Sequence, residues 1–266
     1  WLITPVSYSS GSANLFVCVV GLVSNSTTTY YGLKPVINIS GSLILDKTNY
    51  PLMDGTITNP YRFEGDNKAS IGTKLNGRNS GEYVNFGGYT WRIVESKGGK
   101  NNTKLIMNNV LPSNYVFDTN SSDGLFNPSD GSGTYNASLG HNIGYYLNND
   151  FYNSLTNKTW IETSDWYRGD FNQDYRILKT NSVSAKVGLI NPGELFSGND
   201  IAISTYSWTM LKGTSSSNYA IYTYGVISTA SSSSSYSVRP VINLNSTMTI
   251  TGGEGTSSSP YTITKP

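Results

Sequence analysis

The chain carries the same ordered landmarks twice, once near each end. The N-terminal copy contains Trp1, then Pro35-Val-Ile-Asn38, then Gly55-Thr56 and Pro60-Tyr61. The C-terminal copy contains Trp208, then Pro240-Val-Ile-Asn243, then Gly255-Thr256 and Pro260-Tyr261. An ordered self-match of this kind marks one structural unit that the chain uses more than once. Any fold proposed for one copy must therefore also suit the other.

The repeat predicts the domain organisation. We expect residues 1–44 to be the C-terminal part of an upstream repeat unit, because the chain begins at Trp1 inside the motif. Residues 45–74 are predicted to form a short β connector, residues 75–247 the complete unit, and residues 248–266 a C-terminal connector strand. The Gly-Thr-x-x-x-Pro-Tyr motif indicates a turn at the glycine and a strand after the tyrosine. An incomplete first unit would expose a sheet edge unless something covers it. The second unit, a separate cleaved fragment or a neighbouring subunit could do so, and the last of these would be self-association.

The composition narrows the function classes. Lys+Arg number 18 and Asp+Glu 17, a formal net charge of only +1, which is too small to attract nucleic acid. No apolar run is long enough to span a bilayer. The single cysteine, Cys18, excludes an internal disulfide and is expected to be a small buried hydrophobe within residues 15–20. Hydrophobic residues make up 37% of the chain, enough for a packed core, and the twenty tyrosines suggest a surface suited to binding.

Local patterns predict an α+β fold that is rich in β-strands. Residues 83–94 alternate around Gly87-Gly88, which predicts a hairpin, and residues 104–107 and 187–190 read as further strands. Closing strands are expected within 207–210, 220–228 and 238–244. Residues 112–135 are typical of a loop, and Trp160 and Trp166 are expected to pack beneath a loop. A helical turn is expected over 191–195.

One main amphipathic helix is expected between these strands. Its signal is a set of apolar residues at four-residue spacing: Leu139, Ile143, Leu147, Phe151 and Leu155. Ser138 is the predicted N-cap residue. The single histidine, His141, would lie on the polar side near the start of this helix, as a surface or capping residue.

Catalytic motifs are absent from the sequence. It contains no nucleophile elbow, phosphate-binding loop or dinucleotide fingerprint, so we predict that the protein is not an enzyme. Asp118, Asp123 and Asp130 lie in loop-like segments and are candidate metal ligands, with calcium the cation that oxygen ligands favour. The alternative is that they form ordinary Asx turns. A glycosidase would need two facing carboxylates, a pair that sequence alone does not reveal.

Two residues in the repeated tail have competing interpretations. Arg239 corresponds to Lys34 in the first copy, and each precedes the same proline. Arg239 is expected either to make a structural salt bridge or backbone contact, or to bind a ligand. Trp208 is expected either to be a core residue or to offer a flat surface on which a ligand stacks.

The order of several motifs also carries a family resemblance. Its signature is Phe86-Gly-Gly-Tyr-Thr-Trp-Arg92, then Leu147-Asn-Asn-Asp-Phe151, then Trp208 and Arg239-Pro240. This order resembles uncharacterised extracellular repeat domains of Gram-positive bacteria, and the tail is distantly similar to C-type-lectin-like domains and to the formylglycine-generating-enzyme fold. The resemblance implies a C-type-lectin-like domain. Catalysis through cysteines and copper does not carry over, because the complete unit has no cysteine.

The same resemblance suggests where a ligand would bind. Relatives of this fold that bind receptors display Tyr, Ser and Asn near the tail, and residues 204–236 have that composition. The candidate ligand-binding residues are Trp208, Tyr219, Tyr222, Tyr224, Tyr236 and Arg239. The binding surface is expected to combine the loops around 112–136 and 204–236.

The leading functional hypothesis is a secreted bacterial adhesin, displayed on the cell surface, that binds a glycan or protein receptor without catalysis. The alternative is a structural subunit of an extracellular filament or surface layer. A cell-wall glycan-acting enzyme is the least favoured hypothesis. No cofactor is expected apart from the calcium considered above.

Overall fold

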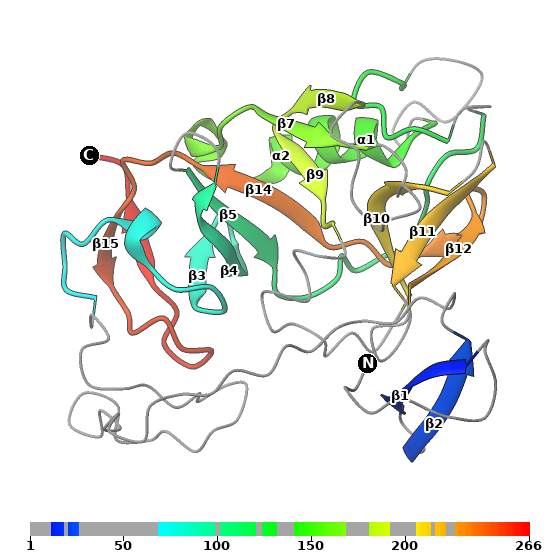
Figure 1. The fold of residues 1–266 in the computed structure, drawn as a ribbon. Coiled ribbons are helices and arrows are strands. Elements are labelled where there is room, and N and C mark those ends of the chain that lie inside the picture. The colour runs from blue at the N-terminus through cyan, green and yellow to red at the C-terminus, as the bar shows by residue number, and fades with distance from the viewer. Residues whose placement is uncertain are drawn as a thin grey trace.

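The computed structural model describes residues 12–18, 21–26, 69–98, 102–120, 124–131, 141–168, 181–191, 206–213, 216–221 and 227–266. Strands dominate these residues, and one main helix accompanies them. The expectation of a strand-rich α+β fold is therefore confirmed at this level. Figure 1 shows the helix on one side of the strands, with the C-terminal strands beside the first hairpin of the complete unit.

An antiparallel sheet of five strands forms the centre of the complete unit. Its order is β3 (Tyr83–Phe86), β4 (Tyr89–Gly98), β5 (Asn102–Met107), β14 (Pro240–Leu244) and β9 (Val187–Leu189). The late strand β14 lies between β5 and β9, with Val241 opposite both Ile106 and Gly188. Burial on both faces explains why the strand reads Pro-Val-Ile-Asn-Leu, with all of its residues buried.

The predicted hairpin at residues 83–94 is confirmed. Phe86 pairs with Tyr89, and the two glycines between them have φ values of 64° and 91°. A two-residue hairpin turn needs positive φ at its central positions, and glycine adopts that conformation without a steric penalty. The turn also approaches Leu155, whose side chain would lie 3.1 Å from a Cβ atom at Gly87.

The main helix starts later than predicted. It runs through α1 (Ile143–Tyr146), the π-helical segment η3 (Leu147–Phe151) and α2 (Tyr152–Ser154). Its N-cap is Asn142, whose side chain accepts a hydrogen bond from the Gly144 amide at 2.9 Å, so the prediction of Ser138 as N-cap is wrong. A π turn holds more residues than an α turn, which keeps apolar residues at four-residue spacing on one buried face.

The remaining strands form smaller sheets. The three-stranded sheet consists of β10 (Ser207–Lys212), β11 (Ser217–Ile221) and β12 (Ile227–Ser231). Two-stranded pairs are formed by β6 (Tyr115–Val116) with β13 (Ser235–Tyr236), and by β7 (Ser164–Tyr167) with β8 (Ser182–Ala185). Further pairs are β15 (Thr249–Gly252) with β16 (Thr262–Thr264), and β1 (Ser12–Cys18) with β2 (Gly21–Ser26). Short 3-10 helices occur at η1 (Leu75–Gly77) and η4 (Lys158–Trp160).

Several local predictions can be compared with these elements. The predicted strands over 104–107, 187–190, 207–210 and 238–244 are confirmed as β5, β9, β10 and β14. The segment expected to be a loop contains the short strand β6. The predicted helical turn at 191–195 lies almost wholly outside the described residues, and so does the environment of the Cys18 side chain.

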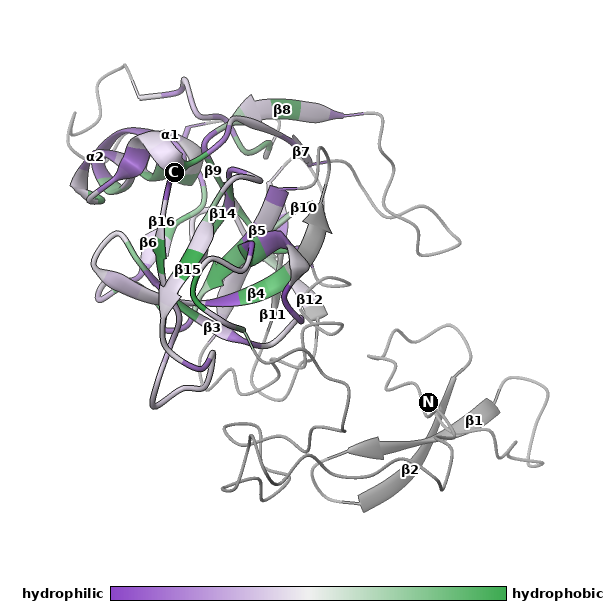
Figure 2. Ribbon diagram, turned by 90° about the vertical axis from the view of Figure 1, so that its left-hand side faces the viewer, coloured by the Kyte–Doolittle hydropathy of each residue, from purple (hydrophilic) through white to green (hydrophobic). Residues whose placement is uncertain are grey.

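Tryptophan and aliphatic residues fill the core. Trp91, Trp166 and Trp208 are each at most 4% exposed. Figure 2 shows apolar residues concentrated in the central strands β4 and β5. Trp91 Nε1 donates a hydrogen bond to the carbonyl of Phe86 at 2.8 Å, and Trp166 Nε1 donates one to Ala185 at 3.0 Å. Burial of these indoles is stable because each N–H finds a backbone partner.

The C-terminal segment, expected to be a connector, packs against the β3–β4 hairpin. Tyr261 is 1% exposed and exchanges backbone hydrogen bonds with the hairpin, donating to Tyr83 and accepting from Asn85, both at 2.8 Å. The predicted turn and strand of its motif are present, since Gly255 has φ 74° and β16 follows Tyr261. A Cβ atom at Gly255 would lie 2.5 Å from the Tyr261 ring, which explains the glycine.

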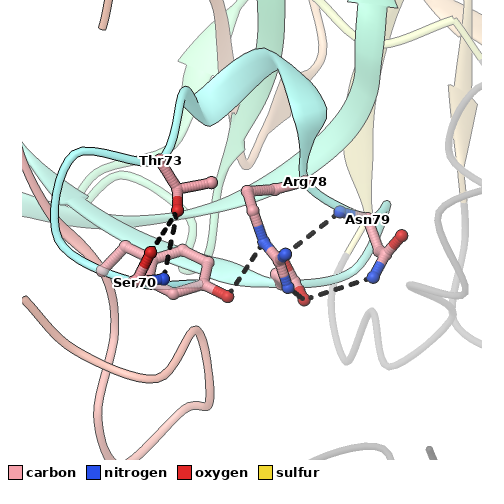
Figure 3. Close-up of polar contacts among 6 residues, drawn as sticks. Ser70, Thr73, Arg78 and Asn79 are labelled. Atoms are coloured by element: carbon pink, nitrogen blue, oxygen red, sulfur yellow. Dashed lines mark hydrogen bonds and ion pairs between the residues drawn. The ribbon is translucent and has the colours of Figure 1, made fainter. Parts of the chain in front are cut away.

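A buried ion pair anchors this segment (Figure 3). Arg78 and Glu82 are 2% and 3% exposed, and their Nη2 and Oε1 atoms lie 2.7 Å apart. Arg78 Nε also donates to the hydroxyl of Tyr261 at 3.1 Å. Burial alone would lower the pKa of Arg78, but the hydrogen bond and charge of Glu82 outweigh it, so the pKa is raised. The charged pair therefore stays intact and ties Tyr261 to residues 78–82.

Candidate functional site

Two segments that were predicted to share a binding surface meet in the structure. Strand β6, from the 112–136 region, pairs with β13, from the 204–236 region, and places Tyr115 opposite Tyr236. A parallel bridge between Ser207 and Ser237 continues this contact. The Ser237 amide donates to the carbonyl of Tyr206 at 2.9 Å, which brings Tyr206 to the same place.

We define the tyrosine ridge as Tyr115, Tyr146, Tyr206 and Tyr236. Tyr115 and Tyr146 stack with their ring centroids 4.4 Å apart, and their hydroxyl oxygens lie 2.7 Å apart. Tyr206 and Tyr236 pack edge to face at 5.5 Å. Tyr206 is 46% exposed, and the other three are half-buried.

Trp208 supports the ridge from the interior. Its ring centroid lies 4.8 Å from that of Tyr236 and 5.5 Å from that of Phe117. Its Nε1 donates to the carbonyl of Tyr115 at 2.8 Å, and the residue is 1% exposed. Of the two interpretations of Trp208, the structure therefore agrees with the core residue, because no face is open for a ligand to stack on.

The surroundings of Tyr146 raise the pKa of its hydroxyl group. Burial, followed by the hydrogen bond with Tyr115, raises the pKa of Tyr146 well above its ordinary value of 10. Nearby Asp150 and Tyr89 act in the same direction. One of the two paired hydroxyls donates to the other, whose own proton is then available to an outside acceptor. The pair therefore retains one hydroxyl donor beyond its internal hydrogen bond.

The remaining ligand-binding candidates are not part of the ridge. Arg239 is 5% exposed and donates to the carbonyls of Met107 at 2.9 Å and Asn108 at 3.1 Å. It makes the backbone contact that one interpretation predicted, and so joins β14 to the end of β5. Tyr219 contributes backbone to β11, but its side chain is outside the described residues, as are Tyr222 and Tyr224.

The metal-ligand candidates do not form a cluster in the described part of the chain. Asp118 is 3% exposed and accepts from Asn142 Nδ2 at 2.7 Å and from the Asn120 amide at 2.9 Å, the latter an Asx turn. Asp130 holds the amide of His141 through its backbone carbonyl at 3.2 Å, and Asp123 lies outside the described residues. Within the described ranges, no group of three His, Cys, Asp or Glu residues is arranged to hold a metal.

His141 differs from its prediction. It precedes the helix instead of lying on it, and it is 9% exposed rather than at the surface. Its carbonyl accepts from the Thr119 amide at 3.2 Å, which joins the loop before the helix to the loop after β6. This backbone role fits the position of His141 next to the Asn142 cap.

Sequence reasoning missed one feature, a shallow pocket at the tip of the β3–β4 hairpin. It has a volume of about 330 Å³ and includes Tyr89, Asn157 and Trp160 in its lining. Trp160, which was expected to pack beneath a loop, is only partly buried. The one feature of the sequence that pointed to this place was the pair of glycines at the hairpin tip. Glycines let another segment approach the backbone closely, but they do not show which segment lies opposite.

Comparison with known proteins adds no assignment: no family model, curated protein or solved structure matches the chain. Among the helices in the described ranges, none is long and apolar enough to cross a membrane. The geometry of the ridge and of the pocket is therefore what remains to indicate a function.

Proposed function

We propose that this chain is a non-catalytic binding module of a secreted bacterial surface protein, which adheres to a cell-surface glycan or protein receptor through the tyrosine ridge. The observation that carries the proposal is the meeting of the β6 and β13 segments, far apart in sequence, which joins the Tyr115–Tyr146 pair to the Tyr206–Tyr236 pair. This is where a Tyr-rich and Ser-rich binding surface was expected.

Tyrosine is well suited to recognition of this kind. It offers a large contact area with little loss of conformational entropy, and its hydroxyl group gives polar specificity. Aromatic residues with partly buried rings often dominate the binding energy of an interface. Tyr206 is the most exposed member of the ridge, and its packing against Tyr236 holds it in one orientation. It is therefore the expected anchor residue.

The environment of the buried carboxylates supports a non-catalytic role. Glycoside hydrolysis needs two carboxylates that face each other across a cleft. Glu82 is bound by the Arg78 guanidinium, and Asp118 accepts hydrogen bonds from Asn142 and Asn120. Both groups are therefore committed to holding the fold. This favours adhesion over a cell-wall glycan-acting enzyme.

The test compares two exposed tyrosines. The full chain, the Tyr206→Ala variant and the Tyr167→Ala variant would be assayed on a glycan array and on cells. Tyr167 is 36% exposed and lies in β7, outside the ridge, so it is a matched control. We expect Tyr206→Ala to weaken binding about 30-fold, as loss of an interface anchor does, and Tyr167→Ala to leave it unchanged.

Equal binding by both variants would contradict the proposal. Regular fibres of the full chain in electron microscopy, without binding to any glycan or cell, would instead favour the structural-subunit hypothesis. Hydrolysis of a cell-wall glycan during the assay would favour the enzyme.

A further inference from the structure

The hairpin pocket has a mixed aromatic and polar lining. The side chains that matter are those of Asn85, Tyr89, Thr90, Asn157, Trp160 and Ile263. They come from the first hairpin, from η4 and the residue before it, and from the C-terminal strand β16. A volume of about 330 Å³ lies at the lower end of the range for small-molecule sites, so the pocket suits a ligand of one ring rather than a long chain.

Trp160 differs from the other three tryptophans that the structure describes. Each of those is buried and donates its indole N–H to a backbone carbonyl. Trp160 is only partly buried, and within the described residues its Nε1 makes no hydrogen bond. One side of its ring is held by Phe86, with the centroids 6.1 Å apart. Trp160 therefore lines the pocket with a ring that Phe86 supports and with an indole N–H that makes no hydrogen bond within the described residues.

Asn157 brings a second unusual feature to the pocket. It is the one non-glycine residue with positive φ (56°) among those described, and it is exposed. A left-handed conformation costs a non-glycine residue about 1 kcal/mol or more, and such strain gathers at functional sites. The Asn157 carbonyl accepts from the Trp160 amide at 2.9 Å, so the strained turn also fixes the tryptophan.

The polar groups of the pocket are neutral. Asn85 accepts a hydrogen bond from the Thr90 hydroxyl at 3.0 Å, which orients the Asn85 side chain. This bond uses the amide oxygen, so the amide N–H groups of Asn85 are not occupied by it. The amide of Asn157 adds another donor and acceptor. Among the described residues, no Asp, Glu, Lys, Arg or His contributes to the lining. An ionic ligand would find no counter-charge here, whereas a ligand with hydroxyl groups and an apolar ring face would be matched on both counts.

We propose that this pocket binds one neutral sugar ring, whose C–H face packs against Trp160 while its hydroxyls bond to Trp160 Nε1–H, Asn85 and Asn157. The site goes beyond the adhesion proposed for the tyrosine ridge and shares no residue with it. It gives the module a second binding site, which distinguishes ligands by their hydroxyl groups and charge. The ridge, by contrast, contributes mainly contact area.

Indole N–H resonances of the full chain provide the test. The five tryptophans give five such signals, and the Trp160→Phe variant identifies the signal of Trp160 by its loss. The probes are methyl glucoside, methyl galactoside and N-acetylglucosamine, with glucuronate as the charged control. We expect the Trp160 signal to shift and saturate with at least one neutral sugar in the millimolar range, and glucuronate to bind more weakly.

Two conservative variants test the named contacts. Asn157→Gly removes the side chain but tolerates the positive φ, and Trp160→Phe keeps an aromatic ring but removes the donor. Each is expected to weaken sugar binding about fivefold, the value of one neutral hydrogen bond. For Trp160→Phe, the readout is isothermal titration calorimetry. Unchanged signals from the other tryptophans show that the fold persists.

The ridge variant Tyr206→Ala separates this proposal from the previous one. It is expected to bind the sugar as tightly as the full chain does. The pocket proposal is overturned if no neutral sugar shifts the Trp160 signal, or if Asn157→Gly and Trp160→Phe both bind with unchanged affinity. Either outcome would leave the test of the ridge intact, because that test measures receptor binding through Tyr206.

Discussion

The tyrosine ridge and the hairpin pocket are both aromatic, but their polar groups are used in opposite ways. In the ridge, the hydroxyls of Tyr115 and Tyr146 bond to each other, and the indole N–H of Trp208 bonds to a carbonyl. In the pocket, the indole N–H of Trp160 makes no hydrogen bond within the described residues, and Asn157 has a left-handed backbone conformation. The ridge residues therefore contribute to stability as well as to the proposed receptor binding, whereas the indole N–H of Trp160 makes no hydrogen bond within the described residues.

This difference has an energetic consequence. Changes inside the ridge should lower the free energy of unfolding, because its aromatic residues pack against one another and against the core. Changes in the pocket should alter ligand affinity with little effect on stability. The following variants test that division, in order of decreasing expected effect.

Trp208→Ala should have the largest effect. It removes a ring that is 1% exposed and in contact with Phe117 and Tyr236, so we expect a loss of about 4 kcal/mol in urea unfolding. Trp160→Phe is the control, with an expected loss below about 1 kcal/mol because its ring is partly exposed. Similar losses of unfolding free energy in the two variants would contradict the expected difference between Trp208, which supports the ridge, and the pocket residue Trp160.

Glu82→Gln should cost about 3 kcal/mol, because it leaves the buried charge of Arg78 without its partner. It also loosens Tyr261 and, through β16, the pocket residue Ile263, so sugar affinity should fall as well. Glu254→Gln, at an exposed position, is the control.

A double variant sharpens the same test. Replacing Arg78 and Glu82 together by Met and Leu removes both charges, and apolar replacement of a buried pair is often neutral. We expect most of the lost stability to return in urea unfolding. A double variant less stable than Glu82→Gln would show that the ion pair itself, and not the orphaned charge, determines stability.

Gly144→Ala should cost about 2 kcal/mol. A Cβ atom there would lie 2.8 Å from the backbone carbon of Asn127, which cannot rotate away, so α1 must shift and carry Tyr146 from Tyr115. Gly77→Ala is the matched control, since no atom lies within 4 Å of its added carbon. Thermal unfolding followed by circular dichroism measures both. Equal stability of the two variants would mean that α1 does not approach the backbone of Asn127 as closely as the structure shows.

Tyr146→Phe should have the smallest effect, about 1 kcal/mol, by removing one hydrogen bond. The pH dependence is specific. The pKa of Tyr146 is raised in the folded protein, so its contribution to stability is complete below pH 10 and is lost as the pH rises above 10. An ultraviolet titration should show one tyrosine that ionises later than the rest, and Tyr146→Phe should remove that phase. If the late phase persists, another tyrosine is the protected one.

Local patterns explain why the hairpin and central strands could be predicted. Alternation and a Gly-Gly turn are properties of a few neighbouring residues, so residues 83–94 form the expected hairpin. The helix start could not be found in the same way. Asn142 accepts from Gly144 locally, but its side chain is oriented by Asp118 and by the amide of Asn127, both distant in sequence. The spacing of apolar residues therefore predicted an earlier helix start, whereas this hydrogen-bond network sets the start at Asn142.

The candidate sites show the same contrast between what local sequence predicts and what distant segments decide. By its composition and patterns, the sequence determined a strand-rich α+β fold with one main helix, little net charge and an abundance of tyrosine. Only the tertiary structure decided which aromatic rings are buried. Trp208 is enclosed because β6 and β13 pair beside it, and Trp160 remains partly open at the hairpin tip. The physical reason is that alternation fixes the face on which a side chain lies, while burial depends on what a distant segment packs against that face.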